Sequence, residues 1–375
     1  MAPQQPTHFP PFRGKARGKP RGRSLAPDAL DALRQLLGDE REQPQRRQRD
    51  LLIEHLHAIQ DALGHLPLTH LRALAAYMNL PMAEVYETAT FYAHFDVIHD
   101  DQSPPPALTL RVCDSLSCQL AGADALRNAL AVGTDPAEVR VLRAPCMGRC
   151  DTAPVVEVGH YHLGHASVER VQAAIAADHI HPEPLDWPRL DAYRQTGGYA
   201  LLSACRAGEV SVESLMDTLE KANLRGLGGA GFPTFKKWFF VRAEAGPRYC
   251  AINADEGEPG TFKDRVIMEG DPHMMLEGMA LASYAIGAEV AYLYIRGEYV
   301  LCIERLETAL AEAYSKGYLG RDILGSGFNL EIHMHVGAGA YICGEETAML
   351  ESIEGRRGEP KLKPPFPAVA GLYEC

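Results

Sequence analysis

The segment Asn223–Trp238, with the sequence NLRGLGGAGFPTFKKW, decides how the second half of the chain is interpreted. It places four glycines close together, with Arg225 before them and Lys236 and Lys237 after them. Glycine lets a backbone turn tightly and approach a ligand without a Cβ in the way. Amide N–H groups in such a loop suit a phosphate. A glycine-rich surface loop without a ligand is the alternative that these letters leave open.

The residues before the glycines argue against an ordinary dinucleotide-binding fold. The letters satisfy G-x-G-x-x-G through Gly226, Gly228 and Gly231. That motif requires a strand in front of it. Residues 210–222 instead space their apolar side chains along one face of a helix. We therefore expect a flavin or nucleotide cradle of another type.

Composition limits the class of protein. The chain has 375 residues, 46% of them hydrophobic, and a net charge of −12. It is long enough for two or three domains, and its acidity argues against nucleic acid as the main partner. No apolar run approaches the roughly 20 residues of a membrane span, and no signal peptide is evident. We expect a cytoplasmic protein whose nine cysteines are thiols or metal ligands.

Four segments follow from the patterns along the chain. Residues 1–26 are rich in Pro, Gly, Arg and Lys, which predicts a disordered basic tail, with an arm for an acidic partner as the alternative. Residues 27–100 have helical periodicity and predict a helical bundle. Residues 101–180 combine strand patterns with four cysteines, and residues 188–375 alternate strands and helices. The second half is therefore expected to be α/β.

The four cysteines form two close pairs, Cys113-x4-Cys118 and Cys146-x3-Cys150, each after a strand-like run. Four thiolates that converge on one site can hold structural zinc or a [2Fe–2S] cluster. Zinc ribbons favour two-residue gaps, so gaps of four and three favour iron–sulfur. Unconnected buried cysteines remain the alternative.

Three motifs in the second half establish a resemblance. In order they are NADEGEPGT at 253–261, GAGAYICGEET at 337–347 and KLKPPFP at 361–367. With the glycine loop, they resemble the FMN- and NADH-binding flavoprotein subunit of respiratory complex I. They resemble equally its relatives in NAD-reducing hydrogenases and NAD-dependent formate dehydrogenases. Residues 30–178 resemble the thioredoxin-like [2Fe–2S] ferredoxin subunit of complex I, through VYETATFY at 85–92 and the cysteine quartet.

The resemblance implies roles for individual residues. The glycine loop and Lys237 would hold the FMN phosphate, Asn253 and Asp255 would bond the ribityl chain and ring, and Glu256 and Glu346 would act catalytically on NADH. An ordinary helix-end lysine at 237, and a charge effect at a helix N-terminus for Glu345 and Glu346, are the alternatives. The rings of Phe232, Phe240 and Phe366 would stack on the adenine of NADH, and Lys363 would lie near its ribose. The implied cofactor-binding residues are Gly226, Gly228, Gly229, Gly231, Lys237, Asn253, Asp255, Glu256, Tyr341, Gly344, Glu345, Glu346, Phe232, Phe240, Lys363 and Phe366.

The implied function is an electron-transfer (diaphorase) subunit between NAD(H), FMN and iron–sulfur clusters. Leu227 stands where the family often has a second arginine. It favours the β subunit of NAD-dependent formate dehydrogenase, whose partner would be a molybdenum- or tungsten-containing α subunit that oxidises formate to CO2. The alternative is a diaphorase subunit of an NAD-reducing hydrogenase or NADH:quinone oxidoreductase. A non-catalytic iron–sulfur or zinc assembly scaffold is the alternative of a different class.

The family also sets an expectation about the end of the chain. Its flavoprotein continues past the position of Cys375 and includes a helical domain that holds a [4Fe–4S] cluster. We therefore expect the α/β FMN/NADH-binding domain to be C-terminally truncated here. The [4Fe–4S] cluster is expected only in that further region.

Overall fold

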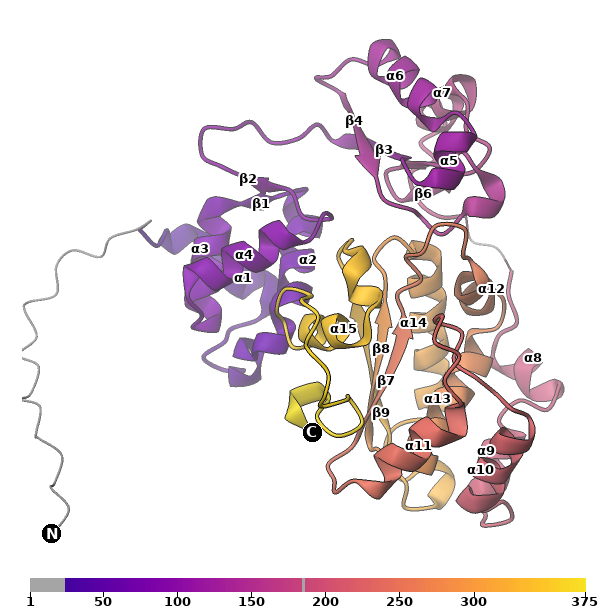
Figure 1. The fold of residues 1–375 in the computed structure, drawn as a ribbon. Helices are drawn as coiled ribbons and strands as arrows, with labels where there is room; N and C mark the ends of the chain where they lie inside the picture. The colour runs from indigo at the N-terminus through magenta and orange to yellow at the C-terminus, as the bar shows by residue number, and fades with distance from the viewer. Residues whose placement is uncertain (1–23, 184–185) are drawn as a thin grey trace, which may run out of the picture.

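The computed structural model describes residues 24–183 and 186–375. The predicted basic tail falls, except for its last three residues, outside this part of the chain. Figure 1 shows a group of N-terminal helices, a small mixed domain and a larger domain built on a parallel sheet.

The N-terminal helices are α1 (Pro27–Leu37), α2 (Leu52–Leu63), α3 (Leu68–Met78) and α4 (Met82–Phe91). Their apolar side chains recur with the period of a helix, and Leu33, Leu56 and Leu74 are buried. Gly64 and Asn79 end α2 and α3 in the left-handed conformation. Two-residue strands β1 (Leu66–Pro67) and β2 (Val97–Ile98) pair beside them, and the helical group is the one predicted.

The second domain has a sheet with the order β4-β3-β5-β6. Its strands are β3 (Leu108–Cys113), β4 (Val139–Ala144), β5 (Val156–Val158) and β6 (Tyr161–Leu163), and its helices are α5 (Leu116–Leu120), α6 (Ala123–Gly133) and α7 (Val168–Ala176). Strands β3 and β4 are parallel, and Cys113 is in register with Ala144. Because parallel strands end at the same edge, the loops after β3 and β4 begin side by side.

The third domain has three parallel strands in the order β7-β8-β9. They are β7 (Tyr249–Ala254), β8 (Val290–Ile295) and β9 (Glu331–Val336). The helices are α8 (Leu190–Gln195), α9 (Ala200–Arg206), α10 (Val212–Lys221), α11 (Thr234–Ala243), α12 (Lys263–Gly270), α13 (Pro272–Ile286), α14 (Val300–Ser315) and α15 (Glu346–Ile353). This arrangement is the predicted α/β class.

The two faces of the parallel sheet are covered by different parts of the chain. Successive strand residues point to opposite faces. Leu293 and Ile295 of β8 join a core with α13 and α14, whereas Tyr294 joins a core with α15 and the N-terminal helices. Figure 1 shows α1–α4 beside α15 on this second side. The N-terminal helices therefore complete the covering of this parallel sheet. Within the described ranges, no helix is long and apolar enough to cross a membrane.

Candidate functional site

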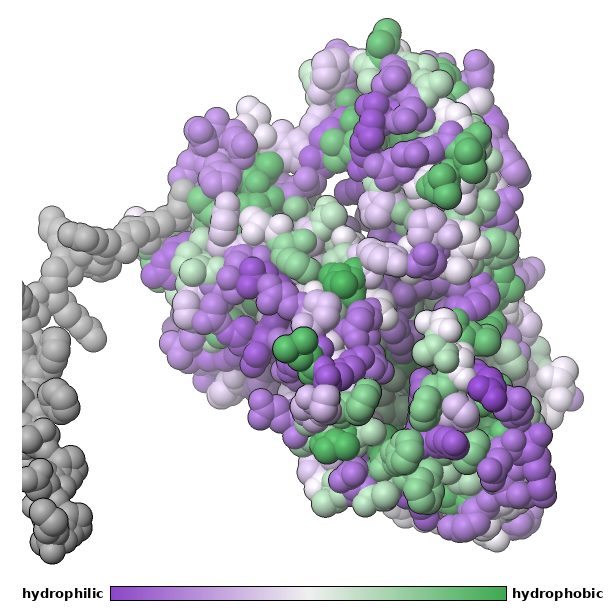
Figure 2. Space-filling model, in the orientation of Figure 1, coloured by the Kyte–Doolittle hydropathy of each residue, from purple (hydrophilic) through white to green (hydrophobic). Residues whose placement is uncertain are grey.

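The three parallel strands end at one edge, where ligands of α/β proteins bind. The segments that follow them are 255–261 after β7, 296–299 after β8 and 337–345 after β9. Figure 2 shows this side of the molecule hollowed between α15 with the following C-terminal loop and the glycine loop with α11. The segments after β7 and β9, the loop that follows α15 and the glycine loop therefore surround one groove.

The glycine loop follows helix α10 and not a strand, so the dinucleotide fingerprint is absent from it as predicted. It folds back on itself: the Gly226 N–H donates to the Phe232 carbonyl at 2.9 Å. Gly229 and Gly231 have φ values of 99° and 60°, which favour glycine. Lys237 Nζ lies 3.3 Å from the position that a Cβ on Gly226 would occupy. The loop thus places a cation against a glycine, as a phosphate cradle requires.

Asn253 and Asp255 lie at the end of β7 and face the loop after β9. The Asn253 amide donates to the Gly344 carbonyl at 2.9 Å, and its oxygen accepts the Asp255 N–H at 3.1 Å. Asp255 Oδ2 is buried and has no hydrogen-bond partner among the described residues. Burial raises the pKa of Asp255 to about 7, against the lowering effect of Arg296. Because buried polar atoms are normally bonded, Asp255 has an unused capacity for a polar ligand group.

Glu256, for which the resemblance implied a catalytic role, lies buried against the start of α12. Its side chain is buried and accepts from the Asp264 and Arg265 N–H groups, from Lys263 Nζ and from the Tyr299 hydroxyl, each at 3.0–3.1 Å. These contacts fasten the start of α12. Glu258 is exposed and accepts from the Tyr341 hydroxyl. The sequence did not single out Glu258, although it lies in the same motif, because the turn of the loop decides which acid is buried and which is exposed.

Glu345 and Glu346 both contact Lys363. Lys363 Nζ donates to Glu345 at 2.9 Å and also to Glu346. The Glu345 carboxylate also caps α15 through the Thr347 and Ala348 N–H groups at 2.8 and 3.0 Å. Although burial opposes it, these hydrogen bonds hold the pKa of Glu345 at about 2. Glu345 therefore interacts with a helix N-terminus, which is the alternative that the sequence left open for both acids. Glu346 is about half exposed and faces Lys363.

The aromatic side chains of the expected adenine site are open to solvent. Phe232 and Phe240 pair with ring centroids 6.4 Å apart. Phe366 is 59% exposed on the C-terminal loop, and Tyr341 is exposed beside Glu258. The structure thus brings Phe232 and Phe240 together and leaves Phe366 on another segment.

The four cysteine thiols gather at the shared end of β3 and β4, with none in a disulfide. Cys146 Sγ lies 3.4 Å from Cys150 Sγ, and the Cys113 thiol contacts those of Cys118 and Cys146. The Gly148 N–H donates to Cys146 Sγ at 3.4 Å. In the described part of the chain, no three His, Cys, Asp or Glu side chains are arranged for a single metal ion. An all-thiol set with N–H donors fits a [2Fe–2S] cluster.

Two cavities were not predicted from the sequence, and the second of them borders the cysteine loop at Pro145 and Met147. One of about 620 Å³ is lined by residues of η2 (Arg49–Leu51) together with Tyr292, His333 and Tyr373. Another of about 340 Å³ lies where the three parts of the chain meet, near His57 and Arg111. Both depend on contacts between distant segments, for which the sequence gives no local signal.

Comparison with known proteins identifies both domains. Residues 219–373 match the family model described as Nuo51 FMN-binding domain. Residues 39–178 match the one described as thioredoxin-like [2Fe-2S] ferredoxin. The matches confirm the predicted fold class and the predicted FMN and [2Fe–2S] cofactors.

Similar proteins are parts of larger enzymes. The F 2 subunit of the NADH-quinone oxidoreductase of Rhizobium meliloti (strain 1021) is 63% identical over 185 residues, which are 49% of this chain and 44% of the relative. The F subunit of the Aquifex aeolicus (strain VF5) enzyme is 57% identical over 184 residues, covering 49% of this chain and 43% of the relative. The chain therefore spans less than half the length of these relatives. A crystal structure of an NAD+-reducing [NiFe]-hydrogenase in the H2-reduced state is similar over 88% of this chain and 58% of that one, with a TM-score of 0.72 and 32% identity.

These relatives overturn the predicted partner. They belong to an NADH-quinone oxidoreductase and an NAD+-reducing hydrogenase. The prediction of a formate dehydrogenase α subunit as the partner was therefore wrong. Leu227, on which that prediction rested, is an exposed loop residue. The chain joins a thioredoxin-like [2Fe–2S] ferredoxin domain to a Nuo51 FMN-binding domain.

Proposed function

We propose that the chain oxidises NADH on FMN and passes the electrons to iron–sulfur clusters, as the diaphorase subunit of a larger oxidoreductase. One contact supports this above the others: the Gly260 N–H, in the loop after β7, donates to Cys150 Sγ at 3.1 Å. The loop with Asn253 and Asp255 at one end thus touches a cluster ligand at its other end. A short path between the flavin groove and the cluster is what such a subunit needs.

FMN, when bound, accepts a hydride and releases single electrons. The residues of the chain bind and orient the two nucleotides. Lys237 and the glycine-loop amides face the FMN phosphate, and Asp255 offers its unused oxygen to the ring system. Glu258 takes the role first assigned to Glu256, and Glu346 with Lys363 faces the NADH ribose and carboxamide. Carboxylates accept hydrogen bonds from hydroxyl and amide groups of this kind.

The acceptor complex is of the quinone-oxidoreductase or the hydrogenase type. The 63% identity to the Rhizobium meliloti relative extends over 49% of the chain. The likeness to the NAD+-reducing hydrogenase covers 88% of the chain and therefore extends across both halves. This observation favours a diaphorase subunit in which ferredoxin and flavoprotein are one chain. The partners in either case are the other subunits of that complex, and we propose a cytoplasmic location for it.

NADH oxidation coupled to a one-electron dye tests this function. The full chain, with iron and sulfide restored, is mixed anaerobically with NADH and ferricyanide, with and without added FMN. We expect NADH-dependent dye reduction only when FMN is bound. A chain that holds stoichiometric FMN and does not oxidise NADH would refute the proposal.

A further inference from the structure

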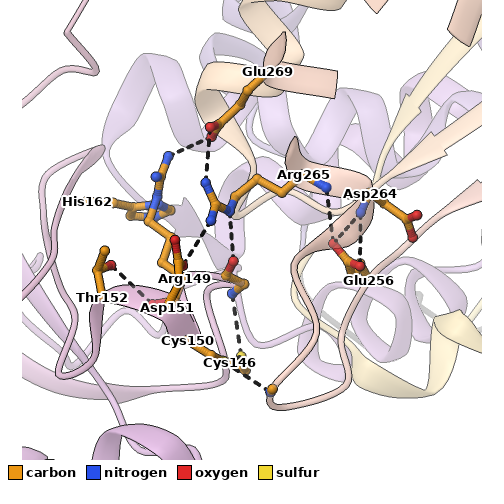
Figure 3. Close-up of polar contacts among 12 residues, drawn as sticks. Cys146, Arg149, Cys150, Asp151, Thr152, His162, Glu256, Asp264, Arg265 and Glu269 are labelled. Carbon is orange, nitrogen blue, oxygen red and sulfur yellow. Dashed lines mark hydrogen bonds and ion pairs between the residues drawn. The ribbon is translucent and has the colours of Figure 1, made fainter. Parts of the chain in front are cut away.

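The cysteine loop Cys146–Cys150 is packed against the flavin half, as Figure 3 shows. Arg265 Nε of α12 donates to the Gly148 carbonyl at 2.8 Å. Arg296, at the end of β8, donates both to the Cys146 carbonyl and to the Glu256 carbonyl, the latter at 2.6 Å. With the Gly260 N–H on Cys150 Sγ, these contacts fasten the loop at three points.

Gly148 shows how closely the two halves approach. It has a φ of 65°, and a Cβ added there would lie 2.1 Å from the Tyr299 hydroxyl of the flavin half. A side chain at this position would therefore force the halves apart. The same tyrosine donates to Glu256, so the cysteine loop rests directly on the loop that follows β7.

The contact surface carries a balanced set of charges, in which Arg265 and Arg296 are buried. Arg149 pairs with Glu269 at 2.8 Å, and Arg265 pairs with Asp151 at 2.9 Å and with Glu269 at 3.1 Å. Arg296 pairs with Glu298 at 2.9 Å. The side chains of Arg265 and Arg296 are only 7% and 5% exposed. Water therefore screens these charges weakly, and the loss of one leaves its partner uncompensated beside the cysteines.

We propose that the flavin half sets the reduction potential of the [2Fe–2S] cluster through the Gly260, Arg265 and Arg296 contacts on the Cys146–Cys150 loop. A reduced cluster carries one more negative charge than an oxidised one. An N–H donor on a ligand sulfur and a nearby cation both favour the reduced form and raise the potential. Arg265 and Arg296 are positioning residues in this account. The proposal rests on the cluster assignment and not on the reaction with NADH.

Opposite charge changes at one ion pair provide the test. The full chain is reduced by dithionite at controlled potentials, and the EPR signal of the cluster gives the reduced-to-oxidised ratio. Arg265→Gln should lower this ratio about tenfold at a fixed potential, which is about 59 mV for one electron. Glu269→Gln should raise the ratio, since it leaves Arg265 and Arg149 in excess. Arg206→Gln is the matched control, because it removes the same charge from α9, where Arg206 contacts Ser326, and should leave the ratio unchanged.

If the substitutions acted only by loosening the Cys146–Cys150 loop, Arg265→Gln and Glu269→Gln would change the reduced-to-oxidised ratio in the same direction. That result would overturn the proposal. An unchanged ratio in Arg265→Gln would overturn it as well. If Arg265→Gln assembles no cluster, Glu269→Gln decides, since it keeps Arg265 and removes the charge that pairs with it. A raised ratio in Glu269→Gln supports the proposal, and a wild-type or lowered ratio contradicts it. NADH takes no part in these titrations, so failure of the proposed function would be seen separately.

Discussion

The cysteine site and the flavin groove differ in how the chain closes them. The thiols come from the ends of two adjacent parallel strands and the segments that follow them, and Cys113, Cys118 and Cys146 are buried. The glycine loop and the C-terminal loop of the flavin half instead carry exposed apolar side chains, Leu227 at 76% and Phe366 at 59%. Cofactor ligands that are already gathered and buried belong to a site that is formed before its cofactor binds. Exposed apolar walls fit a site that its two nucleotides fill.

Cysteine replacement gives the largest effect that separates the two sites. Cys113→Ser or Cys146→Ser should abolish the [2Fe–2S] cluster, because each removes one of four gathered thiols. The flavin groove uses none of these sulfurs, so FMN binding should persist. Iron, acid-labile sulfide and flavin are measured on the same purified chain. Cys205→Ser, at a buried cysteine outside the quartet, is the control and should keep its iron. Unchanged iron in the Cys113 variant would disprove the ligand assignment.

The two acids after β7 should separate stability from nucleotide binding. Glu256→Gln should lower the free energy of unfolding by about 1–3 kcal/mol, because buried hydrogen bonds to a charged group are lost. Glu258→Gln should leave that energy nearly unchanged and raise the KM for NADH, because Glu258 is exposed at the groove. Denaturant unfolding and NADH titrations of both variants provide the measurements. A raised KM in Glu256→Gln at normal stability would restore the role first assigned to Glu256.

A smaller effect concerns the face of the flavin sheet that the N-terminal helices cover. Burial lowers the pKa of His335 to about 3, and its ring stacks on Tyr294 at 5.3 Å. Below pH 6.5 the unfolded chain binds a proton that the folded chain does not, so stability falls as pH falls from 6.5 toward 3. The loss is about 1.4 kcal/mol per pH unit, or about 2 kcal/mol at pH 5.

His335→Asn should remove that contribution to the pH dependence, which thermal unfolding between pH 5 and 7.5 would detect. His333→Asn is the control at an exposed position of the same strand. Equal slopes in the wild-type chain and His335→Asn would show that His335 does not titrate as its burial requires.

The local patterns were sufficient to predict the fold class and the cysteine pairs. They do not predict the contacts between distant segments. The helix before the glycine loop follows from its own periodicity, and the meeting of Cys113 and Cys146 follows from two strand-like runs. Nothing local predicts that Tyr294 shares a core with helices some 200 residues earlier. Likewise, the turn of the loop after β7 decides that Glu256 is buried and Glu258 is exposed, and the letters of the motif do not predict this.

The cluster signal after NADH addition tests the central claim most directly. The full chain, loaded with iron and sulfide, is mixed anaerobically with NADH and frozen, once with FMN and once without it. Electron passage through the flavin groove predicts the EPR signal of a reduced [2Fe–2S] cluster only in the sample that contains FMN. A reduced cluster without FMN, or an oxidised cluster when bound FMN has been reduced by NADH, would contradict the account.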